Sequence, residues 1–169
     1  AQEIANILQN QYCSVFTCPM PDMIVHDPRS FFDSQTVGKN NVSSIQVTED
    51  DIKSAIRSLK NGSAAGPDGV PTILLKQCVN ELASPLLLLT LKSLEAGKFP
   101  ELLKLSKICP IYKGGNRSLP KNYRPVALTS HIAKVMEKIV KKELVSYLEK
   151  NSLLNDRQHG FRHSRSTLS

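Results

Sequence analysis

Two short runs of strand-like composition, at about residues 106–112 and 123–129, limit most strongly what this chain can fold into. They mix β-branched residues with Lys and Arg, and the link between them contains Gly and Asn, which suit a hairpin. Each run also holds a proline, Pro110 or Pro125, and proline within a strand favours an edge strand or a free-standing hairpin. The sequence therefore predicts one β-hairpin with cations along it.

Amphipathic helices are predicted on both sides of this hairpin, because apolar residues recur there at helical spacing between capping signals. The helix expected over residues 47–62 is well marked. Thr48 is its N-cap and Gly62 ends it, and its apolar stripe consists of Ile52, Ala55, Ile56 and Leu59. The expected helices cover residues 1–17, 47–62, 71–82, 84–97 and 130–150, the fourth capped by Ser84 with Pro85 at its first position. The expected fold class is α+β, mostly helical with a β-hairpin.

The chain divides into two expected parts. Residues 1–46 read as a linker, with one helix and then an irregular stretch that contains three prolines. Residues 47–169 hold the remaining elements. No apolar run reaches the roughly 18 residues of a membrane span, so a membrane is not an expected partner. The start lacks the basic segment of a signal peptide. It also lacks Met, which suggests a piece of a longer protein.

Charge is unevenly distributed along the 169 residues, whose net charge is +7. Residues 1–90 contain 6 Lys and Arg against 9 Asp and Glu, whereas residues 91–169 contain 16 against 6. A half with a net charge of +10 is the electrostatic pattern expected of a protein that binds a polyanion such as nucleic acid. A solvated lysine-rich surface would give the same count, so both interpretations stay open.

Few residues suggest catalysis. The adjacent acidic pair Asp50 and Asp51 lies in the first turn of a helix, where carboxylates complement the dipole, and Asp68 fits a turn. The four histidines have no Ser or Cys at suggestive spacing, and the chain has neither a P-loop nor a GxGxxG motif. The four scattered cysteines do not match a zinc site and are expected to be reduced, in a cytosolic or nuclear protein. We expect no metal ligands and no catalytic residue.

The hairpin cations are the remaining candidates. Side chains alternate between the two faces of a strand, so Arg124 is expected to point away from the face of Tyr123, toward solvent or a ligand. Lysine and arginine on a hairpin are suited to gripping phosphate groups, since Lys is a point charge and Arg a bidentate fork. Ordinary surface cations on an exposed hairpin are the equally acceptable alternative.

Five sequence segments in order resemble the reverse transcriptases of non-LTR (LINE-type) retrotransposons, most closely the jockey-type elements. The segments are AAGPDGVP, FPELLKLSKICPIYKGG, NYRPVALTS, AKVMEKIVKKELVSYL and NDRQHGFRHSRST. The resemblance covers residues 45–169. It implies that these residues form the fingers and the beginning of the palm of a right-handed polymerase, and that the chain before them is the linker to that domain.

The resemblance also implies roles for individual residues. The arginine of the YRP motif, Arg124 here, contacts the triphosphate of the incoming nucleotide, and Lys113 matches the lysine of the preceding motif, with Lys121 close enough to substitute. The QxGFR motif lies near the template and nucleotide pocket. The GPDG turn is mainly structural and shapes the approach to the template. The QxGFR motif comprises Gln158, Gly160, Phe161 and Arg162. The GPDG turn comprises Gly66, Pro67, Asp68 and Gly69.

The resemblance further implies that the catalytic aspartates, which hold Mg²⁺ in the parent polymerase, lie downstream of this chain. The implied partners are an RNA template, a DNA primer, deoxynucleoside triphosphates (dNTPs), and the palm and thumb regions of the parent. We therefore expect that the chain alone does not polymerise DNA. One alternative is a non-catalytic remnant that binds RNA or DNA through its basic half. Another is an inert remnant whose long helix lacks part of its apolar cover.

Overall fold

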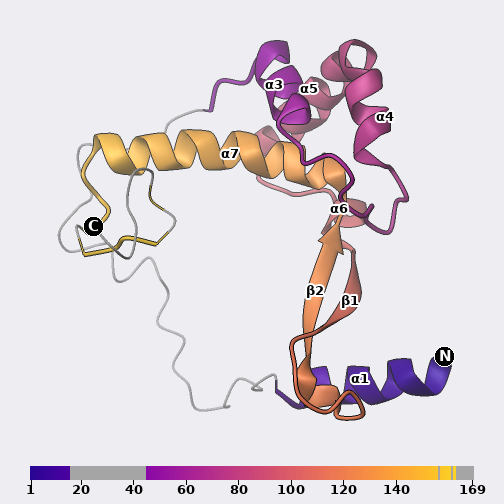
Figure 1. Cartoon of the computed structure of the whole chain (residues 1–169). Helices are drawn as coiled ribbons and strands as arrows, with labels where there is room; N and C mark the ends of the chain where they lie inside the picture. Colours follow the sequence, from indigo (N-terminus) through magenta and orange to yellow (C-terminus); the bar gives the residue numbers. More distant parts are fainter. Residues whose placement is uncertain (16–44, 156, 161, 163–169) are drawn as a thin grey trace.

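A helical unit and a projecting β-hairpin make up the structure, a computed structural model that describes residues 1–15, 45–155, 157–160 and 162 (Figure 1). The hairpin leaves the helical unit near the start of the long helix α7, and the helix α1 lies at its far tip (Figure 1). The elements are α1 Gln2–Ser14, α3 Glu49–Arg57, α4 Thr72–Gln77, α5 Val79–Ala96, α6 Glu101–Lys104, β1 Ser106–Tyr112, the 3₁₀ helix η1 Pro120–Asn122, β2 Tyr123–Thr129 and α7 His131–Lys150. The predicted α+β class is confirmed.

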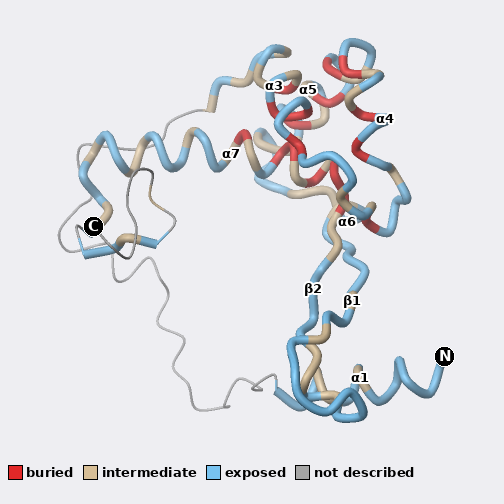
Figure 2. The backbone as a smooth tube through the Cα atoms, viewed as in Figure 1, coloured by how far each residue is buried: buried red, intermediate tan, exposed pale blue. Residues whose placement is uncertain are grey.

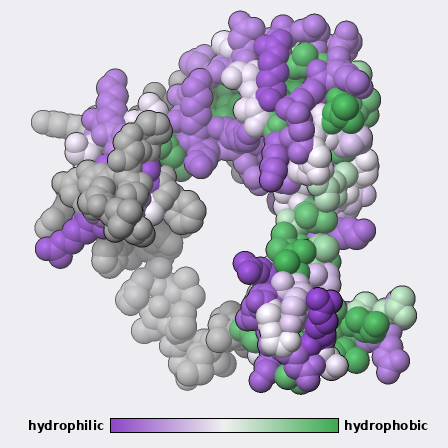
Figure 3. Space-filling model, in the orientation of Figure 1, coloured by the Kyte–Doolittle hydropathy of each residue, from purple (hydrophilic) through white to green (hydrophobic). Residues whose placement is uncertain are grey.

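The hairpin has the bounds that the sequence predicts. Strands β1 and β2 pair antiparallel from Ser106↔Thr129 to Tyr112↔Tyr123. Every residue of both strands is exposed or half-buried, so the hairpin is free-standing, as its prolines indicate (Figure 2). Ile108, Ile111 and Val126 stay exposed on it. Figure 3 shows the resulting hydrophobic surface on the hairpin shaft, between the helical unit and the more hydrophilic tip.

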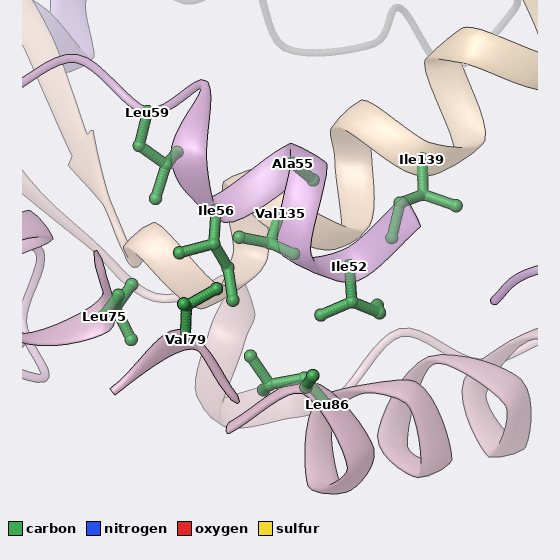
Figure 4. Close-up of a cluster of buried hydrophobic side chains, with 10 residues drawn as sticks. Ile52, Ala55, Ile56, Leu59, Leu75, Val79, Leu86, Val135 and Ile139 are labelled. Atoms are coloured by element: carbon green, nitrogen blue, oxygen red, sulfur yellow. The ribbon is translucent and has the colours of Figure 1, made fainter. Parts of the chain in front are cut away.

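The core lies where α3, α5 and α7 meet, and Figure 4 shows their side chains pointing toward one another. All four residues of the predicted apolar stripe are buried, although Leu59 lies just past the end of α3. The buried cluster comprises Ile52, Ala55, Ile56, Leu59, Leu75, Val79, Ala83, Leu86, Val135 and Ile139. This core fixes the first half of α7 and, through it, the root of the hairpin.

Helix α3 starts at its predicted cap but ends earlier than predicted. The Thr48 hydroxyl accepts a hydrogen bond from the Asp51 N–H at 3.2 Å, and Asp51 accepts from the Thr48 N–H at 3.1 Å, which is a capping box. The helix ends at Arg57 rather than near Gly62. The Ser58 hydroxyl donates to the Ala55 carbonyl and accepts from Lys138 on α7 at 2.7 Å. Such side-chain bonds compete with continued helix, so the end is set by α7.

The predicted boundary between the next two helices is wrong. The sequence predicts a break at Ser84 with Pro85 opening a new helix, whereas the break lies at Cys78 and Pro85 stands inside α5. Proline inside a helix costs roughly 3 kcal/mol, because a hydrogen bond is lost and the ring clashes with the preceding turn. Val79, Ala83 and Leu86 on both sides of Pro85 are buried in one core, and we attribute the continuous helix to their packing. Gly97 ends α5 in the left-handed region, as predicted.

The two terminal helices are close to prediction. Helix α1 spans Gln2–Ser14 within the predicted 1–17, has no buried residue and lies against η1. Helix α7 spans His131–Lys150, close to the predicted 130–150; Ser130 caps its start and Asn151 follows its end. Leu144 is 47% exposed and Val145 36% exposed on its second half, so part of its apolar face is uncovered. The predicted irregular stretch after α1 lies mostly outside the described residues. The short α6 was not predicted.

Within the described part of the chain, no helix is long and apolar enough to cross a bilayer.

Asp51 ties α3 to α7 and makes stability depend on pH. Lys142 donates to Asp51 Oδ1 at 2.8 Å, and this bond, followed by the Thr48 hydroxyl and N–H, lowers the pKa of the carboxyl to about 2. A carboxyl whose pKa is depressed in the folded state stabilises the fold above its unfolded pKa of about 4, and that contribution is lost as the pH falls toward 2. Asp51 is therefore structural, as predicted.

We expect Asp51→Asn to lower the free energy of unfolding by about 1 kcal/mol at pH 7, a value kept small because Lys142 is largely exposed. Urea unfolding at several pH values would show the difference from the wild type shrinking between pH 4 and pH 2. Asp50→Asn is the matched control, since the neighbouring carboxylate has no side-chain hydrogen bond among the described residues. Equal losses in both variants would contradict the assignment.

Candidate nucleotide- and nucleic-acid-binding hairpin

The hairpin and its link carry five cations and no carboxylate. The sequence from Leu102 to Met136 contains neither Asp nor Glu. All five cations are exposed, and none forms an ion pair within the described residues. They are Lys107, Lys113, Arg117, Lys121 and Arg124. Uncompensated like charges repel one another, so an anion that bound beside the cations near the tip would be attracted by them, whereas Lys107 lies at the other end of the strands.

Strand register places two of the predicted residues on one face. Arg124 pairs with Ile111, and the Lys113 N–H donates to the Asn122 carbonyl at 2.9 Å, which continues the pairing by one step. Because side chains alternate, Lys113 and Arg124 lie on the same face as diagonal neighbours. Arg124 is on the opposite face from Tyr123, as predicted. Lys121 belongs to the 3₁₀ turn beside this pair rather than to a strand.

The hairpin tip holds an aromatic cluster that sequence reasoning missed. The ring centroids of Tyr112 and Tyr123 lie 5.5 Å apart, at an interplanar angle of 54°. The guanidinium carbon of Arg117 lies 4.8 Å from the centroid of the Tyr112 ring, which is a cation–π contact. An arginine between two tyrosines is visible in the sequence. Its stacking depends on how the link folds, and no local pattern predicts that.

Hydrogen bonds hold this link in one conformation. The Tyr112 hydroxyl donates to the Gly115 carbonyl, and the Tyr123 hydroxyl donates to the Arg117 carbonyl at 3.0 Å. The Asn122 amide donates to the Asn116 carbonyl at 2.8 Å. Gly114 and Gly115 have positive φ angles of 130° and 92°, which only glycine adopts easily. The link is therefore built as a specific structure.

The predicted turn at Gly66–Gly69 is confirmed, and it lies at the hairpin root. The Gly69 N–H donates to the Gly66 carbonyl at 3.1 Å, and Asp68 Oδ1 accepts from the Val70 N–H at 3.2 Å. A side chain on Gly66 would meet the backbone of Ser130 at 2.6 Å. The turn therefore packs against the junction between β2 and α7, while Pro67 is exposed at its surface.

His131 forms a buried hydrogen-bond network that the sequence analysis did not predict. The histidines have no Ser or Cys at a spacing that suggests catalysis, yet the Ser63 hydroxyl lies 3.0 Å from His131 Nε2, across 68 residues. The Thr72 hydroxyl lies 3.3 Å from the same nitrogen, and His131 Nδ1 donates to the Val70 carbonyl at 2.9 Å. His131 and Thr72 are 1% and 2% exposed. Such buried groups are inaccessible to a substrate, so the network joins the turn to α7 and gives no support to nucleophilic catalysis.

The predicted template-facing residues lie at the other end of α7 from the hairpin (Figure 1). Arg162 makes a bidentate pair with Glu149 of α7, at 3.1 and 2.8 Å, and donates to the Asn155 carbonyl at 3.1 Å. The Gln158 N–H donates to the same Asn155 carbonyl at 3.0 Å, and Gly160 is exposed. Phe161 lies outside the described residues. The structure does not bring this motif together with Lys113 and Arg124.

No group of three or more His, Cys, Asp or Glu side chains in the described part of the chain could hold a metal ion.

Comparison with known proteins gives two curated relatives, both from Drosophila melanogaster, although no protein-family model matches the chain. The chain is similar to the probable RNA-directed DNA polymerase from transposon BS, with 31% identity over 120 residues, 70% of this chain and 13% of that protein. It is also similar to the probable RNA-directed DNA polymerase from transposon X-element, with 30% identity over 103 residues, 60% of this chain and 11% of that protein. The matched segment is thus a small part of either relative.

Proposed function

Because the chain is homologous to a segment of the reverse transcriptases (RNA-directed DNA polymerases) of transposons, we propose that it supplies part of the grip of such a polymerase on its nucleotide and template. In this proposal the parent is a non-LTR, jockey-type element. Residues 47–169 are the fingers and the start of the palm, and residues 1–46 are the preceding linker. The parent activity is RNA-directed DNA synthesis from dNTPs.

Arg124 and Lys113 are proposed to bind the triphosphate of the incoming nucleotide, with Lys121 beside them. The observation that carries this proposal is the shared strand face, on which both cations are exposed and no carboxylate neutralises them. An arginine offers two parallel N–H donors to a phosphate, and a nearby ammonium adds charge without demanding a fixed geometry. A triphosphate is the anion that uses both properties at once.

The remaining predicted residues receive supporting roles. Gln158, Gly160, Phe161 and Arg162 are proposed to lie near the template and nucleotide pocket of the assembled polymerase. The bond from Arg162 to Glu149 would then fix the path of this segment at the end of α7. The GPDG turn is proposed to shape the template approach from the hairpin root.

The metal site of the polymerase is proposed to lie outside this chain, together with the remaining palm and the thumb. When bound, Mg²⁺ aligns the attacking 3′-hydroxyl and the triphosphate. Incubating the purified chain with a primed RNA template, dNTPs and Mg²⁺ should give no extension, and an extended primer would contradict the proposal.

Substituting Arg124 tests the nucleotide grip directly. We expect Arg124→Ala to weaken binding of dTTP to the purified chain about tenfold or more, since a hydrogen bond to a charged group contributes roughly 1.5–3 kcal/mol. Isothermal titration calorimetry would measure it. Lys107→Ala is the matched control, because Lys107 is an exposed cation at the other end of the same hairpin. Unchanged affinity in Arg124→Ala, or an equal loss in both variants, would contradict the assignment.

A non-catalytic nucleic-acid-binding remnant is the second candidate function, supported by the net charge of +10 over residues 91–169. It predicts binding that weakens steeply with salt and is indifferent to sequence, without any effect of dNTP.

A further inference from the structure

We propose that the hairpin tip is a stacking site for an unpaired nucleobase, with the Arg117 guanidinium as the platform and a single-stranded nucleic acid as the ligand. The inference deepens the proposed function and rests on it, because it assigns a nucleic-acid contact to Arg117 and Tyr112, which lie outside the proposed triphosphate grip. The two sites also differ in chemistry, since the triphosphate grip would bind negatively charged phosphates, whereas the tip would stack on the flat face of a base.

The geometry of Arg117 carries the proposal. Its guanidinium stands over one face of the Tyr112 ring at 4.8 Å, and Tyr123 supports that ring from 5.5 Å. Arg117 itself is exposed, and no hydrogen bond or ion pair of its side chain is formed with the described residues. An exposed guanidinium held over one ring keeps part of its surface open to solvent. Nucleobases stack on arginine planes of this kind in proteins that bind single strands.

The surroundings of the tip favour a nucleic acid over an uncharged aromatic ligand. Lys113 and Lys121 flank Arg117 in the same link, all three are exposed, and the run from Leu102 to Met136 has no carboxylate. Phosphate groups on either side of a stacked base would therefore meet cations. A duplex hides the faces of its bases inside the stack, so the tip selects an unpaired strand.

The tip is also preorganised. Both tyrosine hydroxyls and the Asn122 amide are used within the link, on the carbonyls of Gly115, Arg117 and Asn116. These bonds hold the backbone of Arg117 and the supporting ring in place before a ligand arrives. Binding then orders one arginine side chain rather than a loop, which lowers its entropic cost.

A comparison of two oligonucleotides tests the proposal on the full chain. The probes are an unstructured, fluorescein-labelled RNA of about twelve nucleotides, within the usual site size for single strands, and the same length of abasic backbone. Fluorescence anisotropy at fixed salt gives a Kd for each. We expect the wild type to bind the normal strand at least about fivefold more tightly than the abasic strand, which is the effect of stacking one base.

Arg117→Lys keeps the positive charge and removes the planar platform. Because Arg117 is exposed, we expect the variant to fold as the wild type does. We expect it to bring the ratio of the two Kd values close to one. Lys107→Ala is the matched control: it should weaken both probes to the same extent and leave the ratio of the wild type. A wild-type ratio of one, or an unchanged ratio in Arg117→Lys, would overturn the proposal.

The same variants separate this proposal from the triphosphate grip. Arg117→Lys should leave the Kd for dTTP unchanged, whereas Arg124→Ala should weaken dTTP and leave the base-dependent ratio intact. Base-dependent binding without dTTP binding would refute the nucleotide grip and support the tip site. Binding of dTTP that needs Arg124, with a wild-type ratio of one, would support the grip and refute the tip site.

Discussion

Replacing Gly66 with valine is expected to lower the free energy of unfolding by about 3 kcal/mol, the upper range for inserting side-chain atoms into a filled space. A Cβ atom at this position would lie 2.6 Å from the Ser130 nitrogen, 2.7 Å from the Thr129 carbonyl carbon and 2.9 Å from the Ser130 Cα. All three are backbone atoms and cannot turn aside as a flexible side chain would. Urea unfolding followed by circular dichroism at 222 nm measures the loss.

Gly62 supplies the matched control. It has a positive φ of 69°, but nothing lies within 4 Å of the position a Cβ would take. Gly62→Ala should therefore cost only the backbone strain, about 1 kcal/mol. A similar small cost for Gly66→Val would show that the turn yields easily. In that case the turn would not fix the hairpin root, and its proposed role in shaping the template approach would lose its basis.

Elements with local signals were predicted well. The two strands were predicted from composition, the prolines and the glycine-containing link, and their observed bounds agree. Thr48, Gly97 and Ser130 act as caps, because capping depends on a few neighbouring residues. The apolar stripe of α3 was also predictable, because the buried residues of a helix recur at helical spacing within its own sequence.

Elements decided by distant contacts were predicted poorly. Helix α3 ends at Arg57, five residues before Gly62, at the point where Ser58 meets Lys138 of α7 across 80 residues. Pro85 has every local property of a helix start, yet the shared core on both sides of it keeps α5 continuous. Such contacts depend on which elements pack together, and one sequence does not contain that information in a local pattern.

The candidate site divides in the same way. Strand alternation predicts that Arg124 and Tyr123 face opposite sides, and register then adds Lys113 to the face of Arg124. Arg117 on Tyr112 requires a link folded by its own hydrogen bonds, and Ser63 beside His131 requires the turn to reach α7. Neither pairing follows from residue spacing.

Replacing His131 with leucine should lower the free energy of unfolding by about 3 kcal/mol, because several buried polar groups lose their partner at once. Leucine is similar in bulk but leaves the Val70 carbonyl without its donor and removes the nitrogen beside the Ser63 and Thr72 hydroxyls. The loss should also reach the hairpin, since His131 is the first residue of α7 and follows the Ser130 backbone that packs on Gly66.

A double-mutant cycle separates the network from the simple loss of a buried side chain. Thr72→Val removes one hydroxyl, and combining it with His131→Leu should cost less than the sum of the two single variants by about 1 kcal/mol, as for residues in one hydrogen-bond network. Ile56→Ala, in the core formed by α3, α5 and α7, is the matched control, because it is expected to be additive with His131→Leu. Additivity between His131 and Thr72 would mean that the Thr72 hydroxyl does not act on the ring. The turn would then be held to α7 by the Ser63 and Val70 contacts of His131 and by the approach of Gly66 to Ser130, and the orientation of the hairpin cations would depend on those contacts.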